Sequence, residues 1–246
     1  MKLAGVPFVG SDVLGSAIGM DKDVVKRLLR DAGISIADFV TFKRPDNIIF
    51  EDVQEKLGLP LFVKPANAGS SIGINKVHDE DEFDAAVKEA FKFDQKIIIE
   101  EAIIGREIEV AVLGNENPEA SIPGEVIPHH EFYDYSAKYL DENGAGLEIP
   151  AKLTDEETKK IQATAIKTFR TLCCEGMARV DGFLTESGEF IINEINTIPG
   201  FTKISMYPKL WEASGLPYSK LIDRLIELAI GRFEREKQIE TNYGKL

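Results

Sequence analysis

The sequence is short of cysteine, of histidine and of positive charge. It contains 2 cysteines, 3 histidines, and 29 lysine and arginine residues against 42 aspartate and glutamate residues. The adjacent Cys173 and Cys174 have no further ligands for a zinc site, and they indicate packed, free thiols in a reducing cytoplasm. A net charge of -13 argues against nucleic acid or an anionic membrane as the main partner, because both attract basic patches.

Several motifs that identify common protein classes are also absent. No apolar run approaches the length of a membrane-spanning helix, and the first ten residues lack the pattern of a signal peptide. The sequence contains no GxxxxGK[ST], no GxGxxG between a strand and a helix, and no GxSxG. These absences exclude a Walker-type P-loop and argue against a Rossmann dinucleotide site or a serine-based triad.

What is present is the pattern of an ordinary globular protein of one or two domains, with 43% hydrophobic and 29% charged residues. Helices alternate with strands that return as hairpins, which predicts an α+β fold with mixed or antiparallel sheets. The predicted helices cover 21–33, 46–57, 79–91, 154–172 and 217–236, and the predicted strands cover 39–42, 59–65, 74–77, 96–103, 105–114 and 121–127. Residues 1–20 have no capped first element and are expected to be a domain junction.

A hairpin predicted at residues 176–200 carries the strongest candidates for function. Residues 176–200 contain two β-rich runs around the dipeptide at 187–188, which is typical of a two-residue hairpin turn. The register set by this turn pairs Glu186 with Glu189. The many isoleucines of the hairpin indicate a core element, so polar side chains along it are candidates for function.

The same register gathers four polar side chains on one face of the hairpin. It places Asp181 opposite Glu194 and Arg179 opposite Asn196, and side chains two residues apart share a face. Two carboxylates directly opposite each other call for a compensating cation, and oxygen ligands of this kind suit a hard divalent ion such as magnesium. A solvated polar face on an ordinary hairpin is the alternative.

Cations and loops elsewhere favour phosphate chemistry. Lys64 interrupts a buried apolar run, and the glycine and serine loop at 69–73 can fold over phosphates, although a plain hairpin turn is equally compatible with it. Together with Lys22, Lys138 and Arg179, these features suit phosphoryl transfer by positioning and electrostatic stabilisation. The long irregular stretch at 129–148 is typical of a lid or binding loop.

Six segments resemble the ATP-grasp D-alanyl-D-alanine ligases of bacterial cell-wall synthesis. They read MDK, VKPANAGSSIGI, IIIEEAIIGREIEV, FYDYSAKYL, ARVDGF and NEINTIPGFT, and together they span most of the chain. The resemblance implies two lobes that clasp ATP, a central one at 21–104 and a C-terminal one at 105–246. It also implies an α/β domain before residue 1, through which the full-length protein would form a homodimer.

The resemblance further implies a role for each candidate residue. ATP would be bound by Lys22, Lys64, Ser70, Ser71, Glu100, Glu101, Ala102, Ile103 and Glu107, and two Mg²⁺ ions, or Mn²⁺, would be held by Asp181, Glu194 and Asn196. Catalysis would depend on Arg179, Lys138, Ser70, Ser205 and Tyr139, and the second substrate would be held by Gly200, Ser205 and Met206. Tyr139 favours D-alanine as that substrate.

The implied reaction is ATP-dependent joining of two D-alanines. The γ-phosphoryl group would pass to the first carboxylate, and the amine of the second D-alanine would attack the acyl phosphate. Two alternatives remain open: another ATP-grasp carboxylate-amine ligase, and a nucleotide-binding fragment without ligase activity.

Overall fold

The computed structural model describes residues 1–128, 145–202 and 204–240. Its helices are η1 (Lys2–Ala4), α1 (Val13–Met20), α2 (Lys22–Asp31), α3 (Phe50–Leu57), α4 (Glu80–Phe93), α6 (Asp155–Thr171), α7 (Met206–Ala213) and α8 (Tyr218–Glu236). Its strands are β1 (Phe39–Lys43), β2 (Leu61–Pro65), β3 (Asn75–Val77), β4 (Lys96–Glu101), β5 (Arg106–Gly114), β6 (Glu119–Ala120), β7 (Gly124–Pro128), β8 (Ala145–Glu148), β9 (Gly176–Leu184) and β10 (Phe190–Asn196).

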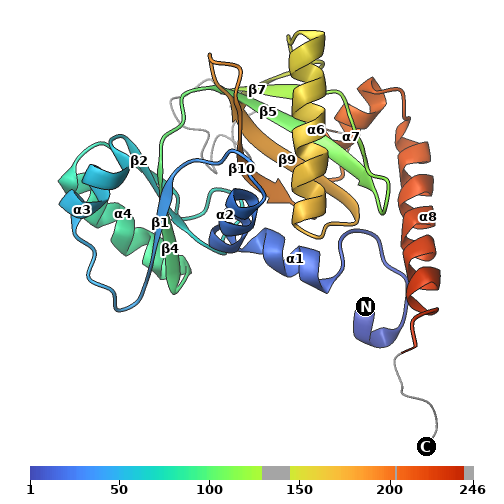
Figure 1. Cartoon of the computed structure of the whole chain (residues 1–246), viewed down its shortest axis with the longest axis horizontal. Helices are drawn as coiled ribbons and strands as arrows, with labels where there is room; N and C mark the ends of the chain where they lie inside the picture. The colour runs from blue at the N-terminus through green and yellow to red at the C-terminus, as the bar shows by residue number, and fades with distance from the viewer. Residues whose placement is uncertain (129–144, 203, 241–246) are drawn as a thin grey trace, which may run out of the picture.

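The strands form two separate sheets. One has four strands in the order β1-β4-β2-β3, and the other has six, in the order β10-β9-β5-β7-β8 with β6 paired to β5. Within both sheets the described strand pairs are antiparallel. Figure 1 shows the smaller sheet with α3 and α4 at one end of the molecule, the larger sheet with α6, α7 and α8 at the other, and α1 and α2 between them. The α+β expectation is confirmed.

The four-stranded sheet separates a core from a polar face. Leu61, Val63, Ile97 and Ile99 pack against α3 and α4 in one hydrophobic cluster. The alternate residues of the same strands, including Lys64 and Glu100, point the other way because strand side chains alternate faces. The predicted buried run around Lys64 is strand β2, and its lysine lies on the face of the sheet that points away from the core.

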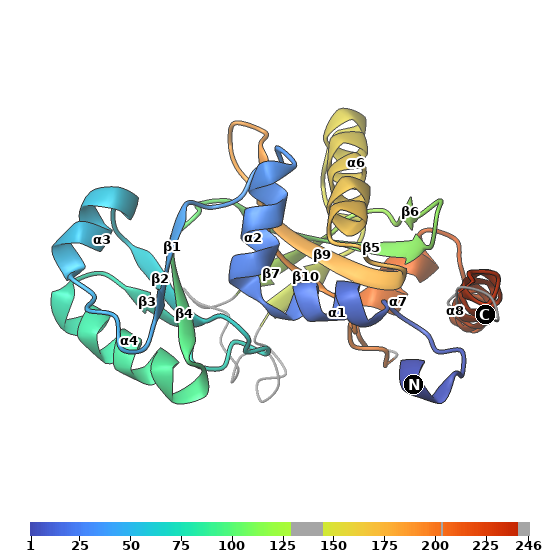
Figure 2. The same cartoon turned by 60° about the horizontal axis from the view of Figure 1, so that its bottom comes forward.

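The six-stranded sheet is covered on both faces. Ile108, Val110 and Val180 pack with α2 and α6 on one face, and Ala111, Leu113 and Met177 pack with α7 and α8 on the other. Figure 2 shows α6 standing apart from α8 beside this sheet. The face of β5 and β9 that packs on α7 and α8 is apolar at that end. Its polar residues lie at the other end, nearer the four-stranded sheet.

The hairpin of β9 and β10 has the two predicted pairs at its far end, but two irregularities that the sequence pattern did not reveal produce them. Its loop is one residue longer than expected, because Leu184 pairs with Phe190 and the Thr185 N–H donates to the Glu189 carbonyl, so the predicted pairing of Glu186 with Glu189 is wrong. A β-bulge at residue 193 then shifts the register back by one residue. The two irregularities cancel each other toward the far end of the hairpin.

Beyond the bulge, Asp181 lies opposite Glu194 and Arg179 lies opposite Asn196, as predicted. The bulge also explains why Ile192 and Ile195, which are three residues apart, both enter the same core cluster.

Two α-helices and the short 3-10 helix η1 were missed by the sequence analysis. Residues 1–20 contain α1, which begins after Asp12 without a side-chain capping bond, and the short α7 follows residue 205. Gly15 of α1 lies so close to the backbone of Cys173 that a Cβ there would clash with the Cys173 carbonyl oxygen. The proposed role of 1–20 as a domain junction, and the two lobes at 21–104 and 105–246, stay predictions. Across the described residues, no helix is long and apolar enough to cross a membrane.

Candidate active site

A cavity of about 540 Å³ lies where the polar faces of the two sheets meet. Its lining includes all nine residues expected to bind ATP, namely Lys22, Lys64, Ser70, Ser71, Glu100, Glu101, Ala102, Ile103 and Glu107. Of the three expected metal ligands, Glu194 lines the cavity directly. Segments that are far apart in the sequence therefore meet around one space.

The first wall comes from the four-stranded sheet and carries a buried ion cluster. The Lys64 ammonium donates to a Glu100 carboxylate oxygen at 2.9 Å, and the Lys26 ammonium of α2 lies 3.5 Å from the same oxygen. Burial alone would raise the pKa of Glu100, but Lys26 and Lys64 outweigh it and hold that pKa below its usual range. Burial lowers the pKa of Lys26, and Glu100 opposes this shift.

Lys22 connects three parts of the site. Its ammonium donates to the Ala68 carbonyl at 2.6 Å and lies 4.0 Å from a carboxylate oxygen of Glu194. The preceding residue, Asp21, caps α2 by accepting from the Val24 N–H, so the position of Lys22 at the first turn is fixed. Lys22 thus links the glycine and serine loop with the predicted metal-binding face.

The loop at 69–73 adopts an uncommon backbone. Ser70 and Ser71 have φ angles of 54° and 57°, and the Ile72 N–H donates to the Gly69 carbonyl. This is the pattern of a type I′ turn, which usually contains asparagine or glycine. Serine in this region costs conformational energy, and such positions cluster at functional sites.

The second wall comes from the six-stranded sheet. Glu107 and Phe183 lie opposite each other on β5 and β9 and both line the cavity. Beside them, Arg106 donates to both oxygens of Glu125, at 2.9 and 2.6 Å. This pairing holds the pKa of Glu125 below its usual range. The bulge residue Asn193 also lines the cavity, and its amide oxygen accepts from Lys64 at 3.4 Å.

The predicted metal-binding face is preformed around Arg179. Its guanidinium donates to both oxygens of Asp181 at 2.7 Å and lies 3.0 Å from Glu109. Burial opposes the charge of Arg179, but the carboxylates of Asp181 and Glu109 raise its pKa above the ordinary value. In the structure Arg179 is therefore the cation that balances Asp181.

The donor set on this face fits a hard divalent ion. Asp181, Glu194 and Asn196 offer carboxylate and amide oxygens from two paired strands, and Mg²⁺ needs one or two carboxylates beside nucleotide phosphates. Among the described residues, no three histidine, cysteine, aspartate or glutamate side chains form a metal cage by themselves. The face suits an ion shared with a ligand better than an ion held by protein alone.

The residues expected at the second substrate lie near the start of α7. A Cβ at Gly200 would come within 2.9 Å of the Ser205 hydroxyl, which accepts from the Thr202 N–H. Ser205 is the N-cap residue of α7. The Met206 side chain is buried in the core with Tyr207, so its contribution to a site would come from its backbone.

Two expected catalytic residues, Lys138 and Tyr139, and most of the predicted lid at 129–148 lie outside the described residues. Sequence reasoning also missed several residues that line the cavity: Ile74, Lys76, Arg106, Glu125 and Asn193. The alternation along 105–114 could have placed Arg106 at the edge of the site. Asn193 could not be found in this way, because the bulge changes the face on which it lies.

The comparisons with known proteins agree with this geometry. A family model described as "D-ala D-ala ligase C-terminus" matches residues 28–227. The chain belongs to the D-alanine–D-alanine ligase family. A ligase of Shouchella clausii is 60% identical over 98% of this chain and 66% of its own length.

Solved ligase structures show the same fold. A D-alanine-D-alanine ligase from Coxiella burnetii superposes with a TM-score of 0.87 at 44% identity, covering 96% of this chain and 64% of that one. A D-Ala:D-Ser ligase from Enterococcus faecalis gives 0.86 at 43% identity, covering 93% and 66%. The ATP-grasp expectation for the fold is confirmed. The chain spans about two thirds of the length of the curated ligases that it matches.

Proposed function

We propose that this chain carries the nucleotide site of a cytoplasmic D-alanine–D-alanine ligase that uses ATP. The full-length enzyme would join two D-alanines through a D-alanyl phosphate and release ADP and phosphate, for peptidoglycan precursor synthesis. The observation that carries the proposal is the cavity between the two sheets, where lysines from α2 and β2 face carboxylates from β4, β5 and β10. Membership of the ligase family supports the same reaction.

The nucleotide would lie between the sheets. The Oε1 atom of Glu100 is buried and has no hydrogen-bond partner in the part of the chain that the structure describes, which suits a donor such as the amino group of adenine, next to Glu101, Ala102 and Ile103. Glu107 would accept from the ribose hydroxyls. Lys22 and Lys64 would contact the phosphates, and the turn at Ser70 and Ser71 would close over them.

Phosphoryl transfer would depend on positioning and charge. Asp181, Glu194 and Asn196 would hold Mg²⁺ or Mn²⁺, which when bound neutralises phosphate charge. Arg179 stands beside these ligands on the same face and would stabilise negative charge on the transferring group. Because Arg179 is already fixed by Asp181 and Glu109, little reorganisation is needed at the moment of reaction.

The second amino acid would bind at the start of α7. Its carboxylate would accept from the Ser205 hydroxyl and from backbone N–H groups at the helix N-terminus, near Gly200 and Met206. We assign Lys138 and Tyr139 to the lid over this position on the resemblance alone. Homodimer formation by the full-length protein also stays a prediction.

The proposal is tested by ADP release in the full-length protein that contains this chain. D-Alanine should stimulate release in the presence of Mg²⁺, and the product should be the dipeptide. The Asp181→Asn variant should lose this activity because it removes a metal ligand and a partner of Arg179. If no D-amino acid stimulated ADP release, the proposal would be contradicted.

A rival second substrate is tested in the same assay. The E. faecalis neighbour is a D-Ala:D-Ser ligase, and its 43% identity to this chain is close to the 44% of the Coxiella burnetii D-alanine-D-alanine ligase. D-Serine and D-lactate should therefore be offered beside D-alanine. Formation of a mixed dipeptide with D-serine would indicate a D-Ala:D-Ser ligase. Nucleotide binding without any ligation would favour a nucleotide-binding fragment without ligase activity.

A further inference from the structure

Lys26 is a buried lysine that sequence analysis did not select and that does not line the cavity. It lies on α2, one turn after Lys22, and only 1% of its surface is exposed. Among the described residues its ammonium has no hydrogen-bond partner, and it lies 5.8 Å from the centre of the Phe39 ring. Burying a charged group in this way is costly, so its retention calls for a compensating interaction.

The compensating interaction is with Glu100. One carboxylate oxygen of Glu100 lies 3.5 Å from the Lys26 ammonium and 2.9 Å from the Lys64 ammonium. Two ammonium groups thus share one carboxylate, and all three residues are buried. The cluster of Lys26, Lys64 and Glu100 carries one surplus positive charge, whereas Lys64 and Glu100 alone would carry none.

This surplus matters because the protein as a whole is strongly acidic. Its net charge is -13, so a polyanion reaches the cavity only if positive charge is concentrated there. A carboxylate at 2.9 Å would cancel most of the attraction that Lys64 exerts on phosphates. A second cation behind the carboxylate removes this cancellation.

We infer that Lys26 is a positioning residue for the nucleotide site: it shares the Glu100 carboxylate and so leaves Lys64 with positive charge to direct at the phosphates. This inference rests on the proposed function, because it assumes that the cavity binds a nucleoside triphosphate. It adds a residue that contacts Glu100 and no ligand.

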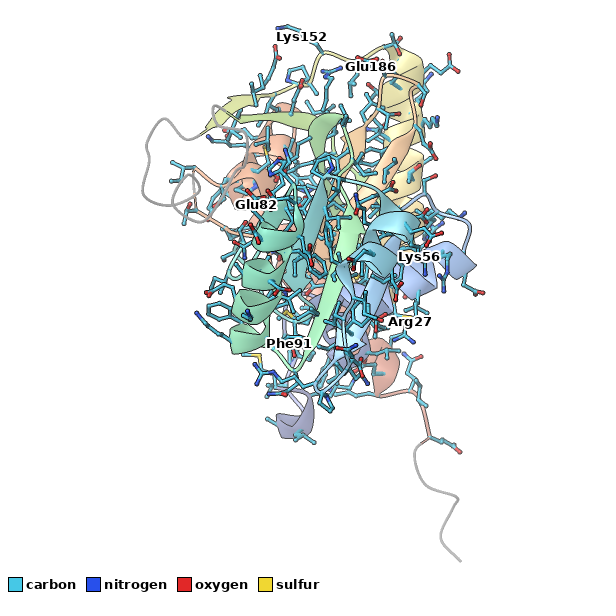
Figure 3. The ribbon with its side chains drawn as sticks, turned by 90° about the vertical axis from the view of Figure 1, so that its left-hand side faces the viewer. Arg27, Lys56, Glu82, Phe91, Lys152 and Glu186 are labelled. Carbon is cyan, nitrogen blue, oxygen red and sulfur yellow. The ribbon has the colours of Figure 1, made fainter. Side chains whose placement is uncertain are left out.

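The experiment compares the affinities of a non-hydrolysable ATP analogue with Mg²⁺ and of adenosine, both measured by calorimetry. The ratio of the two affinities isolates the contribution of the phosphates. Lys26→Met keeps the length of the side chain and removes its charge, and we expect the ratio to fall about tenfold. Arg27→Met is the matched control, since Arg27 lies on the same helix, pairs with Asp23 and points outward (Figure 3). Its ratio should stay within about twofold.

A rescue variant separates charge sharing from a merely structural role. Lys26→Met combined with Glu100→Gln leaves Lys64 with one surplus charge again, so the ratio should return to within about threefold of wild type. Glu100→Gln alone should raise the ratio, and this variant decides the question if Lys26→Met does not fold. An unchanged ratio in Lys26→Met, an equal loss in Arg27→Met, or no recovery in the double variant would overturn the inference.

The wild-type measurement keeps the two proposals apart. If wild type binds adenosine and the triphosphate analogue with equal affinity, or binds neither, the proposed nucleotide site is wrong. If wild type prefers the triphosphate and Lys26→Met shows the same preference, only the role of Lys26 is wrong.

Discussion

At the scale of single residues, the two carboxylates that face each other across the hairpin have different surroundings. The Asp181 side chain is 4% exposed and is held by Arg179, whereas the Glu194 side chain is 38% exposed and lies 4.0 Å from Lys22. Arg179 already relieves the repulsion that the sequence pattern predicts between the two carboxylates. Removal of each negative charge should therefore have a different effect on folding.

We expect Asp181→Asn to lower the free energy of unfolding by about 3 kcal/mol, because it leaves the buried Arg179 with one carboxylate partner fewer. Glu194→Gln should change that free energy by no more than about 0.5 kcal/mol without metal, since its charge is screened by solvent. Both variants should weaken binding of Mg²⁺ with an ATP analogue. Urea unfolding and calorimetry check the prediction, and equal destabilisation by the two variants would contradict it.

The two cysteines allow a second residue-scale prediction. Cys173 is exposed, whereas Cys174 is buried in the core, where burial raises the pKa of its thiol to about 12. Because only the thiolate reacts, iodoacetamide should modify Cys173 in the folded protein and spare Cys174.

The same shift makes stability depend on pH. The folded pKa of Cys174 lies above the unfolded value of about 8.5, so its contribution is complete below that value and is lost as pH rises toward 12. Thermal melts of wild type and Cys174→Ala should therefore converge as pH rises above about 9. A constant difference between them at all pH values would refute the assignment.

At the scale of elements, the hairpin shows what a sequence pattern can and cannot supply. The strong strand signals and the turn residues were enough to place Asp181 opposite Glu194. The loop length and the bulge were not predictable, because Ile192 donates its N–H to Ser35, a residue far away in the sequence that lies beside the hairpin only after folding. The helix predicted over 154–172 was placed correctly, and its Thr154–Glu157 capping box is a local feature.

Gly188 tests the turn geometry that the sequence analysis missed. It has a φ of +75° and open space around the position of a Cβ, so alanine there would be strained without any clash. We expect Gly188→Ala to lower the free energy of unfolding by about 1 kcal/mol. Gly231→Ala is the control, since Gly231 lies in α8 with equally open space, and there alanine should add about 0.5 to 1 kcal/mol. The same sign of effect at both positions would contradict the turn.

At the scale of the whole molecule, the site is made where two sheets approach each other. Sequence reasoning could find Lys64 because it interrupts a buried run, whereas the resemblance supplied Glu100 and the roles of both residues. It could not find Lys26, which reads as one more surface lysine on an amphipathic helix. The role of Lys26 depends on the position of β4 next to α2. That position is set by packing between residues that are far apart in the sequence.

The same architecture predicts which parts respond to nucleotide. The loop at 69–73 and the β4–β5 connection at 102–105 line the cavity and contain exposed residues, whereas β9 and β10 are paired on both sides of the bulge at residue 193 and pack on the core. Ligand binding should order the former and leave the latter unchanged. At a ligand concentration of 100 times Kd, binding should add about 2.7 kcal/mol to the free energy of unfolding.

Hydrogen exchange followed by mass spectrometry can separate these regions. An ATP analogue with Mg²⁺ should slow exchange of the amides at 69–73 and at 102–105, because the phosphates engage the turn and the base engages the β4–β5 connection. Adenosine, which lacks phosphates, should protect 102–105 and leave 69–73 as it is. Exchange along β9 and β10 should stay slow and equal in all three states, since the metal-binding face is held in place by Arg179 before any ligand arrives. If β9 and β10 gained as much protection as the turn, the face would be assembled by the ligand, and the account of a preformed site would be wrong.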